Sequence, residues 1–244
     1  MGLKRTSEKS REGVKGKRKV NPTIVIICEG KDTEVAYFQN FNSKYTKVDV
    51  RIAEKNSKGK NKGKATDPES LVRKAVEIKE GYSIIEKDGD RVWCMFDVDI
   101  NRNNNNAEDS KIAEINKAAV IADKNKIRLG VSSPCFEIWY LLHFEYTTAH
   151  MKDYGAVKKR LIKYIPDYEK NQDVYQLLKE SLHLALRNAE KLRNYHIESG
   201  RNLPLNESEN LKVDALSIVN SNPYTCVDNL INYMEKLEKR KLGL

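Results

Sequence analysis

The chain has 244 residues, enough to bury a hydrophobic core, and this length fits one domain with an extension. Its 44 Lys and Arg residues outnumber its 35 Asp and Glu residues, for a formal net charge of +9. Every apolar run is too short to cross a membrane, and residues 1–20 lack the apolar segment of a secretory signal. We therefore expect a cytoplasmic protein with no membrane partner.

The positive charge is concentrated in two segments. Residues 1–20 contain eight Lys and Arg and two Glu, residues 55–64 contain five Lys and no acid, and the rest has a net charge of −2. Such segments favour a nucleic-acid partner, because docking releases counterions; the alternative is a solvated tail and loop. The candidate backbone-binding residues are Lys55, Lys58, Lys60, Lys62, Lys64 and also Lys31, for which simple solvation is equally open.

Strand-like runs alternate with helical patterns between residues 23 and 144. The predicted strands are Thr23–Cys28, Val48–Ala53, Arg91–Phe96 and Ile127–Ser132. A predicted helix follows each one, at Thr33–Phe41, Pro68–Lys79, Ser110–Lys124 and Pro134–Phe144, with Asp67 and Ser133 as N-caps of the second and fourth helices. This alternation indicates a parallel β-sheet covered by helices on both faces.

The second half of the chain is predicted to be helical. Apolar residues recur at helical spacing in Asn171–Ile197 and again between Val227 and Leu237, and no strand is expected beyond residue 150. The expected organisation is a basic tail over residues 1–20, an α/β domain over residues 21–150, and a helical extension over residues 151–244 packed on the sheet.

Cysteine and histidine residues show no metal-binding spacing. The four cysteines lie far apart and form no CxxC pair, so we expect reduced thiols in the core. His143 lies in an apolar helical stretch and is expected to be a core histidine hydrogen-bonded to the backbone.

Acidic residues end two of the predicted strands. Glu29 follows the first strand, ahead of Gly30, and Asp97 and Asp99 follow the third. Active sites gather at the carboxyl ends of parallel strands, and in an extended Asp-x-Asp both carboxylates project the same way. Converging carboxylates repel one another unless a cation such as Mg²⁺ or Mn²⁺ binds between them. The pattern predicts a metal site; the alternative for each acid is capping of the next helix.

Two further acids are candidates for the same site. Glu34 lies in the first turn of a predicted helix, where it could position metal or water, or merely place a favourable charge at the helix N-terminus. Glu137 lies on an almost wholly apolar helix, where an ionised acid is costly without a partner. It is either a hydrogen-bonded structural acid or a ligand of the same or a second metal.

The joint order of these motifs resembles the Toprim fold. An apolar strand ending in Glu-Gly, followed later by an apolar strand ending in Asp-x-Asp, is similar to the pattern of that group. The resemblance implies an α/β, Rossmann-like parallel sheet flanked by helices. It also implies that Glu29, Asp97 and Asp99 bind Mg²⁺ for phosphodiester chemistry.

Four stretches narrow the resemblance to the RloB family. They are residues 28–38 (CEGKDTEVAYF), 66–72 (TDPESLV), 133–144 (SPCFEIWYLLHF) and 222–225 (NPYT). The family commonly has Glu where Lys31 stands, so an acid there is not essential. RloB-like proteins are encoded in restriction and abortive-infection loci, often beside an ABC-type ATPase, as in the AbiL pair, and the resemblance implies such a partner.

From this resemblance we expect a metal-dependent endonuclease of a phage-defence system that acts on RNA, including transfer RNA, or on DNA. Glu29, Asp97 and Asp99 would hold the ion, and Glu34 or Glu137 would orient water or hold a second ion. Two alternatives stay open: a non-catalytic Toprim scaffold that binds nucleic acid or regulates a partner ATPase, and a primase-like nucleotidyl transferase.

Overall fold

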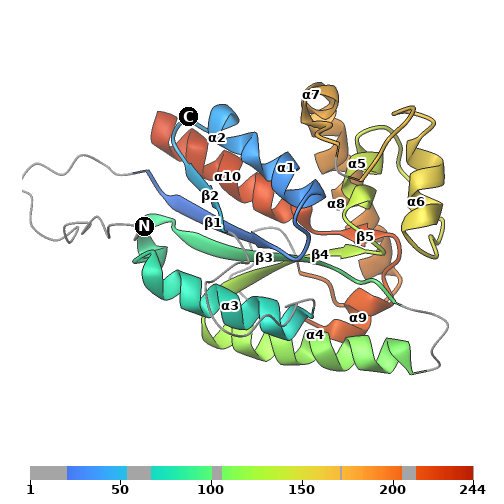
Figure 1. The fold of residues 1–244 in the computed structure, drawn as a ribbon, viewed down its shortest axis with the longest axis horizontal. Coiled ribbons are helices and arrows are strands. Elements are labelled where there is room, and N and C mark those ends of the chain that lie inside the picture. The colour runs from blue at the N-terminus through green and yellow to red at the C-terminus, as the bar shows by residue number, and fades with distance from the viewer. Residues whose placement is uncertain (1–20, 54–66, 101–105, 171, 205–212, 244) are drawn as a thin grey trace, which may run out of the picture.

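A five-stranded β-sheet forms the centre of the computed structural model, which describes residues 21–53, 67–100, 106–170, 172–204 and 213–243. The strand order is β2-β1-β3-β4-β5 (Figure 1). β1 (Thr23–Cys28), β2 (Asp49–Ile52), β3 (Arg91–Asp97) and β4 (Ile127–Ser133) run parallel, and β5 (Tyr224–Thr225) runs antiparallel to β4. The prediction of an α/β fold with a mostly parallel sheet flanked by helices is confirmed.

The central strands are mostly apolar in their interiors because helices cover both faces of the sheet. Alternate residues enter different cores: Ile26 and Met95 face one layer, whereas Ile27 and Phe96 face the other. All of them are buried. This explains why the strands read as continuous apolar runs and not as an alternating pattern.

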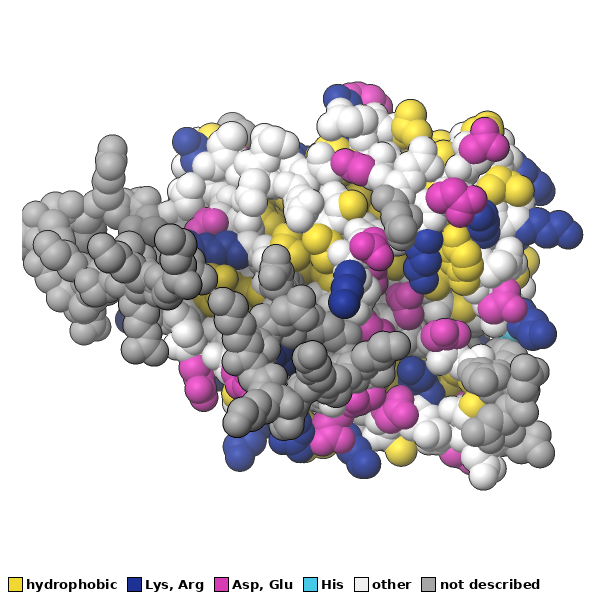
Figure 2. All heavy atoms as spheres, viewed as in Figure 1, with side chains coloured by type: hydrophobic (Ala, Val, Ile, Leu, Met, Phe, Trp, Pro, Cys, Tyr) yellow, Lys and Arg dark blue, Asp and Glu magenta, His cyan; other side chains and the backbone are white. Residues whose placement is uncertain are grey.

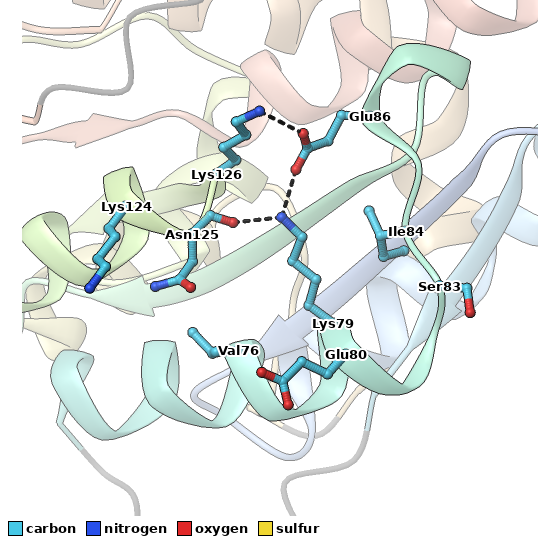
Figure 3. A pocket seen from close by; sticks show the side chains of 9 residues that line it. All are labelled: Val76, Lys79, Glu80, Ser83, Ile84, Glu86, Lys124, Asn125 and Lys126. Carbon is cyan, nitrogen blue, oxygen red and sulfur yellow. Dashed lines mark hydrogen bonds and ion pairs between the residues drawn. The ribbon is translucent and has the colours of Figure 1, made fainter.

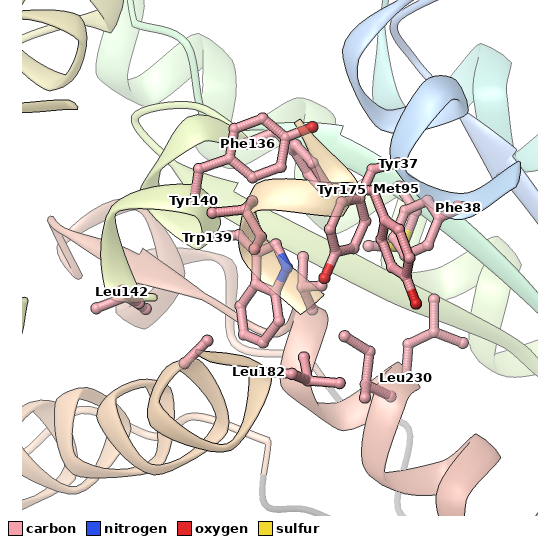
Figure 4. Packing of buried hydrophobic residues seen from close by; sticks show 14 of the residues in the cluster. Tyr37, Phe38, Met95, Phe136, Trp139, Tyr140, Leu142, Tyr175, Leu182 and Leu230 are labelled. Carbon is pink, nitrogen blue, oxygen red and sulfur yellow. The ribbon is translucent and has the colours of Figure 1, made fainter. Parts of the chain in front are cut away.

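One face of the sheet carries most of the helices (Figure 1). Its core is built from α1 (Thr33–Gln39), α2 (Phe41–Lys44), α5 (Glu137–Leu142), α6 (Tyr154–Leu161), α7 (Tyr175–Leu178), α8 (Leu182–Glu198) and α10 (Val227–Leu242). Aromatic rings fill the centre of this layer around Tyr37, whose ring centroid lies 5.9 Å from that of Phe136 and 6.5 Å from that of Trp139 (Figure 4). Such edge-on contacts add to the burial of apolar area and fix how α1 and α5 meet.

The opposite face is covered by α3 (Pro68–Gly81), α4 (Ala107–Lys124) and α9 (Ala215–Val219). Two short 3₁₀ turns, η1 (Glu86–Asp88) and η2 (Lys179–Ser181), complete the described elements. The predicted N-cap of α3 is confirmed, because the Asp67 carboxylate accepts the backbone N–H of Ser70 at 2.8 Å. No helix in the described part of the chain is long and apolar enough to span a membrane.

Three sequence predictions about elements are wrong. A strand does exist beyond residue 150, since β5 pairs with the end of β4. Ser133 is not a helix cap: it pairs with Tyr224 in the sheet, and α5 begins only at Glu137. The helical stripe predicted over Asn171–Ile197 is not a single helix: its described residues form α7, η2 and α8, and α8 contacts α5.

The C-terminal elements complete both layers of the sheet. α10 and α9 both contact β4, and α8 contacts β5. A fully buried ion pair joins Arg193 on α8 to Asp228 on α10.

The predictions for cysteine and histidine residues are confirmed. Cys28, Cys94, Cys135 and Cys226 are all buried and free. His143 is buried, and its Nδ1 lies 3.0 Å from the carbonyl oxygen of Leu178.

Candidate active site

The topology brings the ends of the first and third strands together. β1 and β3 are neighbours in the sheet, with Cys28 paired to Met95, so the residues that follow them share one edge. The Glu29 backbone N–H donates to the Met95 carbonyl oxygen at 2.8 Å. The Glu29 carboxylate in turn accepts the backbone N–H of Asp97 through Oε2 at 3.2 Å. Glu29 therefore reaches across to the end of β3.

Gly30 makes room for a second carboxylate. A Cβ at position 30 would lie against the Glu34 carboxylate, 2.9 Å from Oε1 and closer still to Oε2. Glu34 is buried at the start of α1, and its side chain occupies the space that glycine leaves. The absence of a side chain at Gly30 thus brings Glu34 to the turn that follows Glu29.

The Asp-x-Asp pair lies at the end of β3. Met95 and Val98 face opposite cores, so the alternation of side chains continues to the residue between Asp97 and Asp99. Asp97 is half-buried, whereas Asp99 is exposed beyond the end of the strand. Only the first aspartate of the pair therefore belongs to the enclosed part of the site.

Glu137 enters the site from the first residue of α5, the helix that follows β4. It is fully buried, and its Oε1 accepts a hydrogen bond from the Tyr168 hydroxyl at 3.3 Å. Its Oε2 has no hydrogen-bond partner among the described residues. A buried carboxylate oxygen left without a donor is costly, and a bound cation would satisfy it.

The carboxylates influence one another electrostatically. Burial, followed by the nearby charges of Glu34, Glu137 and Glu29, raises the pKa of Asp97 well above its usual range. Burial is also the main reason why the pKa of Glu34 is raised, with smaller contributions from Glu137 and Glu29. We call Glu29, Glu34, Asp97 and Glu137 the acid cluster; within it, the ionised forms of Asp97 and Glu34 are disfavoured.

A lysine that sequence reasoning missed lies beside the acid cluster. Partial desolvation lowers the pKa of Lys170, but the nearby Glu137, Asp97 and Glu34 outweigh this effect and raise it. Lys170 follows α6 and is far from the other site residues in sequence, and no local pattern distinguishes it from other surface lysines. Only the fold brings it to this edge of the sheet.

The oxygen atoms of the acid cluster are of the type that a hard divalent cation prefers, but the side chains are not arranged around a single ion position. Carboxylate oxygens are the ligands that Mg²⁺ and Mn²⁺ prefer. Within the described ranges, however, no three His, Cys, Asp or Glu side chains are already placed as ligands of one ion. Rotation of the acid-cluster side chains, or of exposed Asp99, would be needed to complete a coordination shell.

The predicted basic residues cannot all be placed. Lys31 is exposed in the turn after β1, directly following Gly30. Lys55, Lys58, Lys60, Lys62 and Lys64, like the tail over residues 1–20, lie outside the described residues. On the face shown in Figure 2, acidic and basic side chains lie close together across the described surface.

A pocket of about 480 Å³ lies away from the acids (Figure 3). It is lined by the ends of α3 and α4 and by residues that precede β3 and β4, including Lys79, Glu86 and Lys126. Glu86 joins the two lysines, at 2.6 Å from Lys79 and 3.1 Å from Lys126. Because the pocket lies at the amino ends of the strands, it contains none of the predicted site residues.

Comparison with known proteins gives one match. The family model described as "RloB-like protein" matches residues 24–234. Searches of curated proteins and of solved structures each returned no significant match.

Proposed function

Because this chain belongs to the RloB-like family, we propose that it is a metal-dependent phosphodiesterase that cleaves nucleic acid. We further propose that its sheet is of the Toprim type and that it works in the cytoplasm in a phage-defence system. Its substrate would be RNA, including transfer RNA, or DNA, and its partner an ATPase encoded beside it.

The observation that carries this proposal is the convergence of the acid cluster. Four carboxylates meet there after three different strands, and burial together with their mutual repulsion raises the pKa values of Asp97 and Glu34. An arrangement that costs stability is retained at functional sites more often than elsewhere. A divalent cation would remove the repulsion.

The residues have distinct roles in this proposal. Glu29, Asp97 and Asp99 would hold Mg²⁺ or Mn²⁺, and the ion, when bound, would polarise the scissile phosphate and activate water. Glu29 also fixes the end of β3 through the Asp97 backbone. Glu34 and Glu137 would orient a water molecule or hold a second ion, with Tyr168 holding Glu137 in place.

The second candidate is a non-catalytic scaffold that binds nucleic acid or regulates the partner ATPase. It is favoured by the lack, among the described residues, of three side chains already arranged around one ion. Against it stands the acid cluster itself, since a scaffold gains nothing from burying mutually repelling carboxylates.

The test is nuclease activity on single- and double-stranded RNA and DNA, with the partner ATPase present and absent, in Mg²⁺, Mn²⁺ or chelator. We expect cleavage in either metal, none in chelator, and a loss of about 100-fold or more for Asp97→Asn and Glu29→Gln. Cleavage that survives both substitutions, or full activity in chelator, would refute the catalytic assignment. Expression toxicity of the same variants provides an independent readout.

A further inference from the structure

Segment Tyr154–Lys170 packs beside the acid cluster and carries a lysine toward it. The segment consists of α6 and the residues that follow it, and α6 contacts α5, the helix that begins with Glu137. Nothing in the family match or in the strand-end motifs assigns a role to this segment. Its position suggests that it forms part of the site.

Three contacts fix the end of this segment against the acid cluster. The buried Tyr168 donates its hydroxyl to Glu137. The Thr33 hydroxyl, one residue before Glu34, donates to the backbone carbonyl of Lys170. The Tyr140 hydroxyl donates to the Thr33 carbonyl at 3.2 Å, which ties the same turn to α5. The backbone of Lys170 is therefore held at a defined place by residues that adjoin the carboxylates.

The ammonium group of Lys170 is positioned but not paired. Its Nζ lies 5.0 Å from the centroid of the Tyr154 ring, a cation–π distance that restrains the flexible stem. Lys170 is exposed, and it forms no ion pair with any residue in the described part of the chain. By contrast, the neighbouring Lys158 is paired to Glu169 at 3.0 Å. A restrained, exposed ammonium is available to an anion that approaches the acid cluster.

We propose that Lys170, with Tyr154 beneath it, forms a phosphate-binding subsite at the edge of the acid cluster, and that it positions a nucleic-acid phosphate there. This inference rests on the proposed function for the identity of the anion. Negative charge repels phosphate from the acids, whereas a fixed cation next to them attracts it, and lysine is a common point-charge ligand of phosphate. The lysine is charged at neutral pH, as an ordinary lysine is, and nearby carboxylates raise its pKa further.

The experiment measures binding of a fluorescent single-stranded oligonucleotide by wild type, Lys170→Ala, Lys170→Arg and Lys163→Ala, at low salt in Ca²⁺ or chelator. Lys163 is the matched control, because it is an exposed lysine of the same segment beyond the end of α6. We expect Kd to rise about tenfold for Lys170→Ala, less than twofold for Lys163→Ala, and to recover partly for Lys170→Arg. Thermal melting in the same buffers reports whether each variant is folded.

The outcomes separate this inference from the proposed function. Equal losses for Lys170→Ala and Lys163→Ala would overturn it, since the effect would then be general electrostatic attraction. Unchanged oligonucleotide binding together with a lowered Tm for Lys170→Ala would also overturn the inference. Lys170 would then be only a counterion that stabilises the carboxylates. A Lys170-specific loss in a protein without nuclease activity would support the subsite and refute the catalytic proposal alone.

Discussion

Gly30 shows how one residue sets the composition of the site. The space that a side chain at this position would occupy is filled by the carboxylate of Glu34. Any larger residue would push this acid away from Asp97. The Glu-Gly sequence alone did not show that the Glu34 carboxylate lies against this glycine.

Asp97 gives the clearest prediction at the scale of a residue. Its pKa is raised from an ordinary value of 3.8, so the folded protein binds its proton more tightly than the unfolded chain does. The corresponding stability is fully present below about pH 4 and is lost as the pH rises through the raised value. In chelator, Asp97→Asn should therefore become increasingly more stable than wild type between pH 4 and pH 8.

Thermal melting of both proteins across this pH range measures the effect. We expect a higher Tm for Asp97→Asn at pH 8 by roughly 2–4 °C, which corresponds to about 1 kcal/mol in a chain of this size. Glu34→Gln should act in the same direction, because its pKa is also raised. If Asp97→Asn were less stable than wild type at pH 8, the fold would stabilise the ionised carboxylate of Asp97. That result would contradict a raised pKa for this residue.

At the scale of elements, strands with strong local patterns were predictable and tertiary features were not. β1 was found at its observed bounds because five consecutive apolar residues follow Thr23 and are themselves followed by Glu29 and Gly30. β5 has only two residues, so it has no periodicity to detect, and it exists because the chain returns beside β4. The end of β4 was placed one residue short, since its last residue is held by β5 and not by any local preference.

The buried ion pair between α8 and α10 yields a prediction for element packing. Arg193 and Asp228 are only 2% and 0% exposed at their side chains, so removal of one leaves the other charged group buried without its partner. Asp228→Ala should lower the free energy of unfolding by about 3–5 kcal/mol, measured by urea denaturation. The double variant Arg193→Met/Asp228→Leu should be clearly more stable than Asp228→Ala, because neither charge remains. A loss below about 1 kcal/mol in the single variant would show that water reaches the pair.

For the molecule as a whole, the parallel sheet was predictable and the full composition of the site was not. Glu29 and Asp97 could be placed together from sequence because the carboxyl ends of parallel strands share an edge, and β1 and β3 are indeed neighbours. Lys170 could not be found, because the contact that holds its backbone there comes from Thr33, which is far away in the chain. The RloB-like family model matches residues 24–234, a range that includes Glu29, Asp97 and Lys170.

The most direct test of the central claim is calorimetric titration of the whole protein with Mn²⁺ at pH 5.5 and pH 7.5. We predict saturable binding that is tighter at pH 7.5, because protons compete for the carboxylates whose pKa values are raised. Asp97→Asn should weaken Mn²⁺ binding about tenfold or more. A loss of this size is typical when a group that supports a metal ligand is removed, and removal of a ligand itself should cost at least as much. Wild type that binds no Mn²⁺ at either pH, or Asp97→Asn that binds it as tightly as wild type, would contradict the assignment of a metal to the acid cluster.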